Sequence, residues 1–320
     1  NCCRLDLDPQ AAAEEQMGHI CQELKAVQAT HQQQQLRETI RYRAGKRQVA
    51  RLAGLPQVGE AKNLSVPAGS FKLSLLQKGS PDNLRLTSAE RRSPARGEIE
   101  VRVQAAGLNF IDVLDTLGLL LFERDWLGVE CAGEVVAVGD GVDQFAVGDA
   151  VMALAAGSLG QFVTLPAALA VAQPHNLSPQ RAATLPANFL TACYALKTVA
   201  QLKAGERILI HAAAGGTGMA AVKVAQQLGA EVYATASPSK WSVLRQMGVK
   251  HVLNSRTLDF ADAIRAQTDG QGVDVVLNSL SGEFVGKGLA VLAPGGCFVE
   301  IGKRDVRSPK QVAKLKTDIR

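Results

Sequence analysis

Apolar and polar positions follow two different periods along the second half of the chain. Five short apolar runs predict buried strands, at residues 207–211, 231–236, 251–255, 273–278 and 296–301. The segments between these runs have helical spacing and predict helices, at residues 219–228, 240–247, 260–268 and 282–292. Strands that alternate with helices favour a right-handed, parallel, doubly wound α/β sheet, because each helix must pack back onto the sheet.

The first half of the chain has a different pattern. Short alternating segments and Gly-Asp turns predict strands, at residues 71–76, 98–105 and 135–138, within 145–154, and at 162–165. Residues 178–200 then change to helical spacing and join the two halves. These patterns predict a β-rich domain at residues 58–185, followed by the doubly wound domain at residues 186–320.

Residues 1–57 have the composition of a linker or of the tail of a preceding domain. They are acidic at first and then rich in glutamine, with a modest helical pattern at residues 11–27. A small hairpin is predicted at residues 39–52, with its turn at residues 44–45. Because the first residue is Asn1 rather than Met, we expect a piece of a longer chain.

A turn almost without side chains, His211-Ala-Ala-Ala-Gly-Gly-Thr-Gly218, lies between the first predicted strand and helix of the sheet. Backbone N–H groups and the helix dipole converge at such a turn, and both favour a pyrophosphate. A glycine turn alone is often only a tight connection, but the strict alternation after it favours a dinucleotide site. The residues predicted to bind the cofactor here are Ala214, Gly215, Gly216, Thr217, Gly218 and Met219.

The end of the second predicted strand indicates which dinucleotide binds. An NAD site places an acidic residue there to hold the ribose hydroxyls, whereas this chain has Thr235-Ala-Ser-Pro-Ser-Lys240. Ser237 can donate to a 2′-phosphate, and the cations of Lys240 and Arg256 can neutralise it. The alternative is that Ser237 caps a helix and Lys240 is merely solvated. The missing acid favours NADPH.

Composition excludes several classes of function. The 320 residues are 47% hydrophobic and 20% charged, without an apolar run near the ~20 residues of a membrane span and without a secretory signal. The six cysteines have no metal-pair spacing and indicate reduced thiols in the cytoplasm. A net charge of +5 is too diffuse for nucleic acid, although it suits a phosphorylated or acidic partner.

Six motifs together resemble one known family. They are Gly107–Leu114, Gly128–Gly133, Phe189–Leu196, His211–Gly218, Asn278–Glu283 and Glu300–Asp305. On these residues the chain resembles the medium-chain dehydrogenase/reductase superfamily, in which a chaperonin-ten-like β domain precedes a Rossmann domain. Within that superfamily it is similar to the enoyl reductase domains of modular polyketide synthases and animal fatty acid synthases. Residues 4–52 resemble the linker that precedes this domain.

The resemblance implies a reductase without metal. Zinc enzymes of the superfamily carry Cys and His where this chain has Asn109 and Val129, and a catalytic zinc needs three protein ligands. The four-cysteine structural zinc lobe is absent as well.

The implied reaction is the NADPH-dependent reduction of an α,β-unsaturated acyl thioester. Hydride goes to the β-carbon, charge develops on the thioester oxygen, and an acid protonates the α-carbon. The implied partners are an acyl carrier protein and neighbouring synthase domains, in a monomer or a homodimer. By resemblance, Asn109 and Thr191 line the nicotinamide pocket, and Asn278, Ser279 and Gly302 border the cofactor cleft. Lys303, directly after the fifth predicted strand, is the best candidate for the proton donor. The alternative for Lys303 is a solvated lysine at a strand end.

The chain also departs from the family pattern. Ile111 replaces a frequent Arg, and the residues after Leu117-Gly118 are Leu119–Phe122, where many members carry a Tyr. A sixth Rossmann strand and a carboxylate near Lys303 are expected after Arg320, so we expect a truncated Rossmann domain. Three other functions stay open: a cyclopropane-forming variant acting on a γ-halogenated enoyl thioester, a free-standing quinone or enone reductase, and an inactive structural domain.

Overall fold

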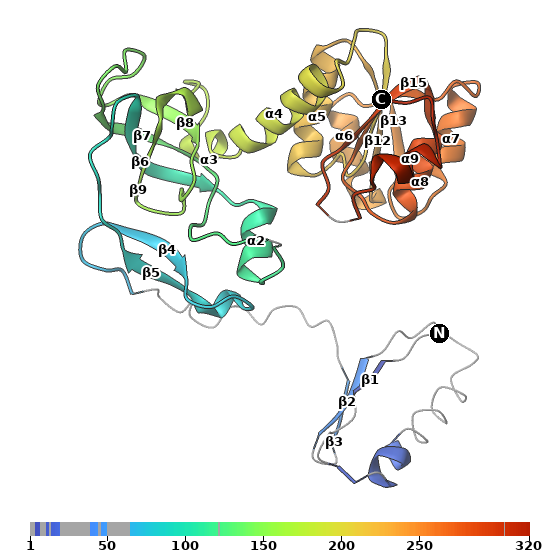
Figure 1. Cartoon of the computed structure of the whole chain (residues 1–320), viewed down its shortest axis with the longest axis horizontal. Coiled ribbons are helices and arrows are strands. Elements are labelled where there is room, and N and C mark those ends of the chain that lie inside the picture. Colours follow the sequence, from blue (N-terminus) through green and yellow to red (C-terminus); the bar gives the residue numbers. More distant parts are fainter. Residues whose placement is uncertain are drawn as a thin grey trace. The chain divides into compact units, whose positions relative to one another are not determined.

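The computed structural model describes residues 4–6, 11–12, 14–19, 39–43, 46–49, 65–120, 122–303 and 305–320. The chain divides into two compact units, Asn1–Asn63 and Leu64–Arg320 (Figure 1).

The first unit contains a small sheet of three strands. These are β1 (Arg4–Asp6), β2 (Thr39–Arg43) and β3 (Lys46–Val49). β2 and β3 pair antiparallel, which confirms the predicted hairpin, and β1 adds a parallel strand that the sequence did not predict. Residues 14–19 are helical, within the predicted segment 11–27. The predicted turn at 44–45 lies outside the described residues.

The second unit begins with the β-rich part. A hairpin of β4 (Phe71–Leu75) and β5 (Leu84–Ser88) precedes an antiparallel sheet of order β10-β8-β7-β6-β9. Its strands are β6 (Glu98–Gly107), β7 (Glu130–Val138), β8 (Ala150–Leu154), β9 (Phe162–Pro166) and β10 (Ala170–Ala172). Buried aliphatic residues from these strands, among them Ile99 and Val135, form its core.

Three of these strands were missed or cut short by the sequence prediction. β5 and β10 were not predicted, and β7 begins at Glu130 rather than at Val135. The start of β7 was missed because residues 130–133 are all buried and the run begins with a glutamate. Such a segment has no apolar–polar alternation.

The remainder of the second unit is the predicted parallel sheet, and its order is β13-β12-β11-β14-β15. Its strands are β11 (Arg207–Ile210), β12 (Glu231–Ala236), β13 (His251–Asn254), β14 (Val273–Asn278) and β15 (Leu292–Glu300). Its helices are α5 (Gly216–Gln227), α6 (Trp241–Gln246), α7 (Phe260–Gln267) and α8 (Glu283–Ala290). The doubly wound prediction is confirmed.

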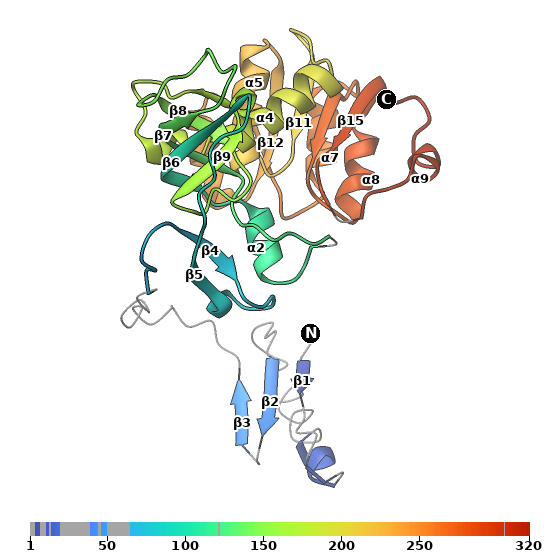
Figure 2. The same cartoon turned by 60° about the vertical axis from the view of Figure 1, so that its left-hand side comes forward.

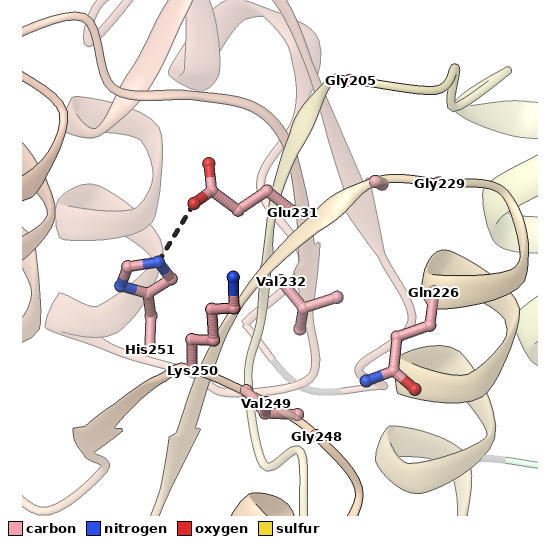
Figure 3. A pocket seen from close by; sticks show the side chains of 10 residues that line it. Gly205, Gln226, Gly229, Glu231, Val232, Gly248, Val249, Lys250 and His251 are labelled. Atoms are coloured by element: carbon pink, nitrogen blue, oxygen red, sulfur yellow. Dashed lines mark hydrogen bonds and ion pairs between the residues drawn. The ribbon is translucent and has the colours of Figure 1, made fainter.

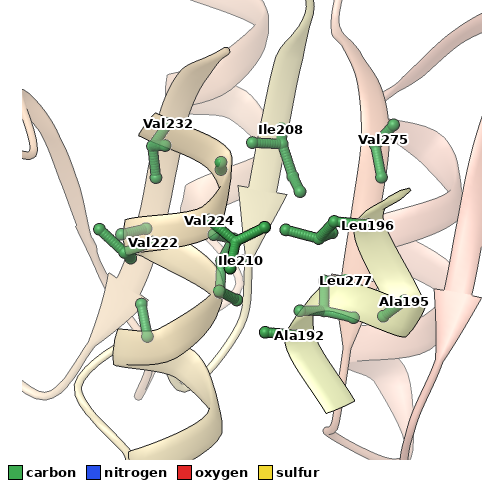
Figure 4. Packing of buried hydrophobic residues seen from close by; sticks show 14 of the residues in the cluster. Ala192, Ala195, Leu196, Ile208, Ile210, Val222, Val224, Val232, Val275 and Leu277 are labelled. Atoms are coloured by element: carbon green, nitrogen blue, oxygen red, sulfur yellow. The ribbon is translucent and has the colours of Figure 1, made fainter. Parts of the chain in front are cut away.

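Helices lie on both faces of this sheet (Figure 2), and successive side chains of β11 point to opposite faces. Ile208 and Ile210 pack with residues of α5 and with Leu196 (Figure 4). Leu209 points to the other face, into the cluster built by α7 and α8. Helix α8 ends two residues earlier than expected, because Leu292 already pairs with Val273 as the first residue of β15.

The joining segment is helical, as expected, but it is divided. It contains α3 (Pro179–Ala182), α4 (Pro186–Cys193) and a π-helical turn, η3 (Tyr194–Val199). Two further helices were not predicted, α2 (Phe110–Thr116) and α9 (Pro309–Ala313). The described residues also contain three short 3₁₀ turns, η1 (Pro81–Asn83), η2 (Ala167–Leu169) and η4 (Pro238–Lys240). None of the helices in the described part of the chain is long and apolar enough to span a membrane.

His211 follows β11 and is buried among aromatic rings. Its Nδ1 lies 3.0 Å from Thr235 Oγ1, and its ring packs edge-on against Phe260 at a centroid distance of 5.0 Å. Burial lowers its pKa from 6.5 to about 4. His211 is therefore neutral in the folded protein at neutral pH, whereas the unfolded chain binds a proton there below pH 6.5.

Stability should consequently fall as pH is lowered from 6.5 towards about 4, because the unfolded state binds more protons in that window. Urea denaturation at several pH values measures this dependence. In His211→Leu its slope should be smaller, whereas in His175→Gln, which removes an exposed histidine, it should be unchanged. An equal pH dependence in His211→Leu and the parent protein would contradict this assignment.

Candidate active site

The carboxyl edge of the parallel sheet brings most of the predicted site residues together. The strand order reverses between β11 and β14, and doubly wound folds bind ligands outside the carboxyl ends of the strands at this switch point. The glycine turn follows β11, Ser279 follows β14, and Lys303 comes three residues after the end of β15.

The glycine turn is open to a ligand on one side and packed against protein on the other. The first intrahelical bond of α5 joins Met219 N–H to Gly215 O at 2.8 Å, so the N–H groups of Gly216, Thr217 and Gly218 precede it. Gly215 is exposed. A Cβ on Gly218 would instead meet the carbonyl oxygen of Ala212 and lie 2.6 Å from Ala213 Cα. Free N–H groups on an open, glycine-lined helix start fit a pyrophosphate.

Asn188 on α4 completes this turn, and the sequence analysis missed it. Its Oδ1 accepts a hydrogen bond from Thr217 Oγ1 at 2.9 Å, and its Nδ2 donates to Thr184 O at 3.0 Å. A Cβ on Gly216 would lie 2.9 Å from Asn188 Oδ1, so a side chain at this position would displace the Asn188 amide. The contact joins residues 29 positions apart, so no local sequence pattern predicts it.

The three residues predicted to bind a 2′-phosphate follow neighbouring strands. Ala236 pairs with Asn254 at the ends of β12 and β13, and Ser237 comes one residue and Arg256 two residues after these strand ends. Ser237 stands at the N-cap position of η4, but its hydroxyl makes no capping bond and lies 3.4 Å from Ser239 Oγ. Lys240 and Arg256 are exposed, and neither forms an ion pair with a carboxylate of the described residues.

Asn109 and Thr191, the residues predicted to line the nicotinamide pocket, both donate hydrogen bonds within the protein. Asn109 immediately precedes α2 and donates from Nδ2 to Glu130 Oε1 at 2.8 Å. Thr191 is exposed on α4, and its hydroxyl donates to Ala187 O at 2.7 Å. Within the described residues, no hydrogen bond joins either of these two side chains to the glycine turn.

Asn278 is fully buried and its amide is satisfied inside the protein. Its Nδ2 donates to Glu300 Oε2 at 2.6 Å and to Leu280 O at 2.7 Å. Glu300 Oε1 also accepts from Gly302 N–H at 2.6 Å. The side chain of Asn278 therefore shapes the sheet edge and has no donor left for a ligand, whereas Ser279 and Lys303 are exposed.

A pocket of about 340 Å³ lies at the opposite edge of the sheet (Figure 3). Glu231 and His251 from the first residues of β12 and β13 line it, joined by a 3.0 Å hydrogen bond, together with Lys250 and three turn glycines. Since it borders the amino-terminal ends of the strands, it is not the cofactor site.

No group of three or more His, Cys, Asp or Glu side chains within the described ranges is arranged to hold a metal ion. The absence of metal from the working enzyme stays a prediction.

Activity should survive dialysis against a chelator, because Asn109 and Val129 stand where zinc ligands would be required. Metal analysis of the purified protein, alongside turnover before and after dialysis, measures this. A stoichiometric metal lost together with turnover would contradict it.

Comparison with known families agrees with the architecture. Residues 95–175 match the family described as "Alcohol dehydrogenase GroES-like domain", and residues 216–318 match the family described as "Zinc-binding dehydrogenase". A GroES-like sheet followed by a Rossmann sheet defines the medium-chain dehydrogenase/reductase superfamily, whose members are oxidoreductases that use a nicotinamide cofactor.

Individual relatives narrow the family further. The chain is 42% identical over 286 residues to a phenolphthiocerol/phthiocerol polyketide synthase subunit of Mycobacterium tuberculosis, covering 84% of this chain and 13% of that protein. It is 48% identical over 219 residues to a pikromycin polyketide synthase component of Streptomyces venezuelae, covering 68% of this chain and 6% of that protein. The chain thus spans a small part of these multidomain relatives.

Solved structures give the same result. CurK enoyl reductase is 48% identical with a TM-score of 0.76, covering 78% of this chain and 79% of that one. The CurF enoyl reductase cyclopropanase is 42% identical with a TM-score of 0.73, with coverages of 78% and 79%. A mycobacterial protein solved with NADPH is 30% identical with a TM-score of 0.69, with coverages of 77% and 78%. This chain belongs to the enoyl reductase domains of modular polyketide synthases.

Proposed function

We propose that the protein reduces the C=C bond of an α,β-unsaturated acyl thioester with NADPH, on a substrate carried by an acyl carrier protein. The observation that carries this proposal is the shared carboxyl edge of the sheet, where an open phosphate-binding turn and an exposed lysine follow strands of one sheet. Membership of the enoyl reductase family supplies the substrate class. Residues 58–185 would then form the substrate domain, residues 186–320 the cofactor domain, and residues 1–57 the connection to a neighbouring synthase domain.

The residues of the glycine turn would hold the pyrophosphate, and Ser237, Lys240 and Arg256 would hold the 2′-phosphate. Two exposed cations without a carboxylate among the described residues leave a positive, accessible surface after β12 and β13. A phosphate there gains charge-assisted hydrogen bonds that NADH cannot make. When bound, the cofactor supplies a hydride for the β-carbon of the acyl group.

The remaining chemistry needs donors from the chain itself. Charge that develops on the thioester oxygen must be stabilised, and the α-carbon must receive a proton. Lys303 is the candidate for both tasks, because it is exposed at the edge where the cofactor would bind. No tyrosine lies in the region 117–122 that could share the task.

Lys240→Ala should weaken NADPH binding by about 1–3 kcal/mol and leave NADH binding nearly unchanged, since only NADPH carries the 2′-phosphate. Fluorescence titration with each nucleotide measures the two affinities. Lys250→Ala is the matched control, because that lysine lies at the amino-terminal edge of the sheet. Equal affinity of the parent protein for NADPH and NADH would contradict the assignment of the cofactor.

A cyclopropane-forming reaction is the second candidate, favoured by the similarity to the CurF cyclopropanase and by the apolar residues 119–122. In such a reaction the enolate displaces a γ-halide instead of taking up a proton.

One experiment separates the candidates. The protein is incubated with NADPH and either crotonyl or γ-chlorocrotonyl pantetheine thioester, and the products are identified by mass spectrometry. We expect the saturated thioester from crotonyl substrate. Cyclopropane from the chlorinated substrate, with little saturated product from either, would favour the second candidate. Binding of NADPH without any product would contradict both reactions and favour a structural domain.

A further inference from the structure

Glu130, the first residue of β7, is a buried carboxylate at the meeting point of three segments. Only 2% of its surface is exposed, and no Lys, Arg or His of the described residues forms an ion pair with it. It pairs in the sheet with Gly107, where an added Cβ would lie 2.5 Å from Glu130 Oε1 and 2.6 Å from Ala183 O. The glycine is required there because the glutamate and the segment before α4 occupy the space.

The two carboxylate oxygens of Glu130 each accept one hydrogen bond, from different parts of the fold. Oε1 accepts from Asn109 Nδ2 at 2.8 Å, and Oε2 accepts from Ala187 N–H at 2.8 Å. Ala187 belongs to the first turn of α4, whose N–H groups have no partner within the helix. A carboxylate at a helix start is also favoured by the helix dipole, which compensates part of the cost of burying the charge.

These contacts determine the orientation of the Asn109 amide. An ionised carboxylate can only accept, so the amide nitrogen of Asn109 must face it. The same nitrogen lies 3.4 Å from Gly107 O, so both of its hydrogens are directed at protein acceptors. Asn109 therefore cannot donate to a thioester oxygen while Glu130 holds its amide nitrogen.

The second hydrogen bond of Glu130, to Ala187 N–H, leads towards the glycine turn proposed to hold the phosphates. Ala187 is followed by Asn188, whose Oδ1 accepts from Thr217 Oγ1 at the start of α5. The first turn of α4 is thus held on one side by Glu130 from the β-rich part and on the other by the glycine turn. Glu130, Ala187, Asn188 and Thr217 form a continuous polar connection from Asn109 to the site of the pyrophosphate.

We propose that Glu130 is a positioning residue of the reductase, which orients the Asn109 amide and couples it, through the first turn of α4, to cofactor binding at the glycine turn. This proposal rests on the proposed function for its effect on turnover. Its effect on cofactor affinity does not depend on the identity of the acyl substrate.

The test is a pair of double-mutant cycles on the full chain, with turnover of crotonyl pantetheine thioester in one cycle and NADPH affinity in the other. Glu130→Gln keeps the side-chain size but leaves only one side-chain oxygen to accept from the two donors, Asn109 Nδ2 and Ala187 N–H. We expect it to lower kcat by about tenfold or more, the scale of a misplaced site group. In an Asn109→Ala background it should have little further effect on kcat, because Glu130 acts through that residue.

The second cycle measures NADPH affinity by fluorescence. Glu130→Gln should raise the Kd by about threefold or more, and in an Asn188→Ala background this increase should disappear, because coupled residues are not additive. Glu100→Gln is the matched control: Glu100 is also buried, at 3% exposure, but it pairs with Arg91 at 2.6 Å away from this site. It should lower the melting temperature while leaving kcat and the Kd unchanged.

Independent, multiplicative effects in both cycles would overturn the proposal, and so would equal losses of kcat and affinity in Glu130→Gln and Glu100→Gln. A parent protein that binds NADPH but reduces no enoyl thioester would refute the proposed function alone. The affinity cycle would then decide the role of Glu130 by itself.

Discussion

Replacing Lys303 with alanine is expected to lower the turnover of an enoyl thioester by about 10²–10⁴-fold, the usual contribution of a general acid. The ammonium group lies on the exposed carboxyl edge of the sheet, three residues after β15, where it can meet charge on the thioester oxygen and deliver a proton. Because the glycine turn proposed to hold the phosphates lies between β11 and α5, NADPH affinity should be unchanged. Steady-state kinetics together with NADPH titration measure both quantities, and kcat should fall without a change in Kd.

Lys203→Ala is the matched control for this prediction. Lys203 is also exposed, but it precedes β11 and lies at the amino-terminal edge of the same sheet. Its removal should leave kcat unchanged. If Lys303→Ala also turned over at the parent rate, Lys303 would be only a solvated strand-end lysine and the proton would come from another group or from water.

The second large effect is expected from Gly218→Ala. The new methyl group would meet the backbone of Ala212 and Ala213, with the Cβ 2.6 Å from Ala213 Cα, and backbone cannot rotate away as a side chain can. The start of α5 must therefore move away from the turn that follows β11, which should cost about 3 kcal/mol of stability, the upper end of the range for overpacking. Since that movement displaces the N–H groups at the start of α5, NADPH affinity should fall by roughly tenfold or more.

Gly286→Ala is a control for which the expected change in stability has the opposite sign. Gly286 lies within α8, its φ is not positive, and a Cβ there would meet nothing within 4 Å. Alanine should raise stability by about 0.5–1 kcal/mol, because it reduces the entropy of the unfolded chain. Urea denaturation of both variants measures the difference. A Gly218→Ala protein as stable as the parent, with unchanged NADPH affinity, would contradict the close packing of α5 against Ala212 and Ala213.

The elements that the sequence predicted well are the strands marked by a continuous apolar run and the helices marked by a period. The strands β11, β12 and β14 appear as apolar runs because both faces of the sheet are covered by helices, so nearly all of their side chains are buried. The glycine turn was predictable because a close backbone approach requires a residue without a side chain, as Gly218 shows. Helix α5 nevertheless begins at Gly216, three residues before the predicted start at Met219, because glycines were assigned to the turn.

The contacts that organise the site were not predictable in the same way. Asn188 reaches Thr217, and Glu130 reaches Asn109 and Ala187, only because the fold brings distant segments together. A single polar residue in an otherwise apolar or irregular stretch has no period to mark it. The same holds for the hydrogen bond between the buried Asn278 amide and Glu300, whereas the place of Asn278 beside the cofactor, which the resemblance implies, stays a prediction. The roles of Lys303, Thr191 and the 2′-phosphate residues stay predictions.

The most direct test of the central claim follows the hydride itself. NADPH carrying deuterium at C4 of the nicotinamide is mixed with the protein and crotonyl pantetheine thioester in ordinary water, and the product is examined by mass spectrometry and NMR. The account predicts a saturated thioester with deuterium on the β-carbon and a solvent-derived hydrogen on the α-carbon. Saturated product with deuterium on the α-carbon, or unchanged crotonyl thioester in the presence of bound NADPH, would contradict it.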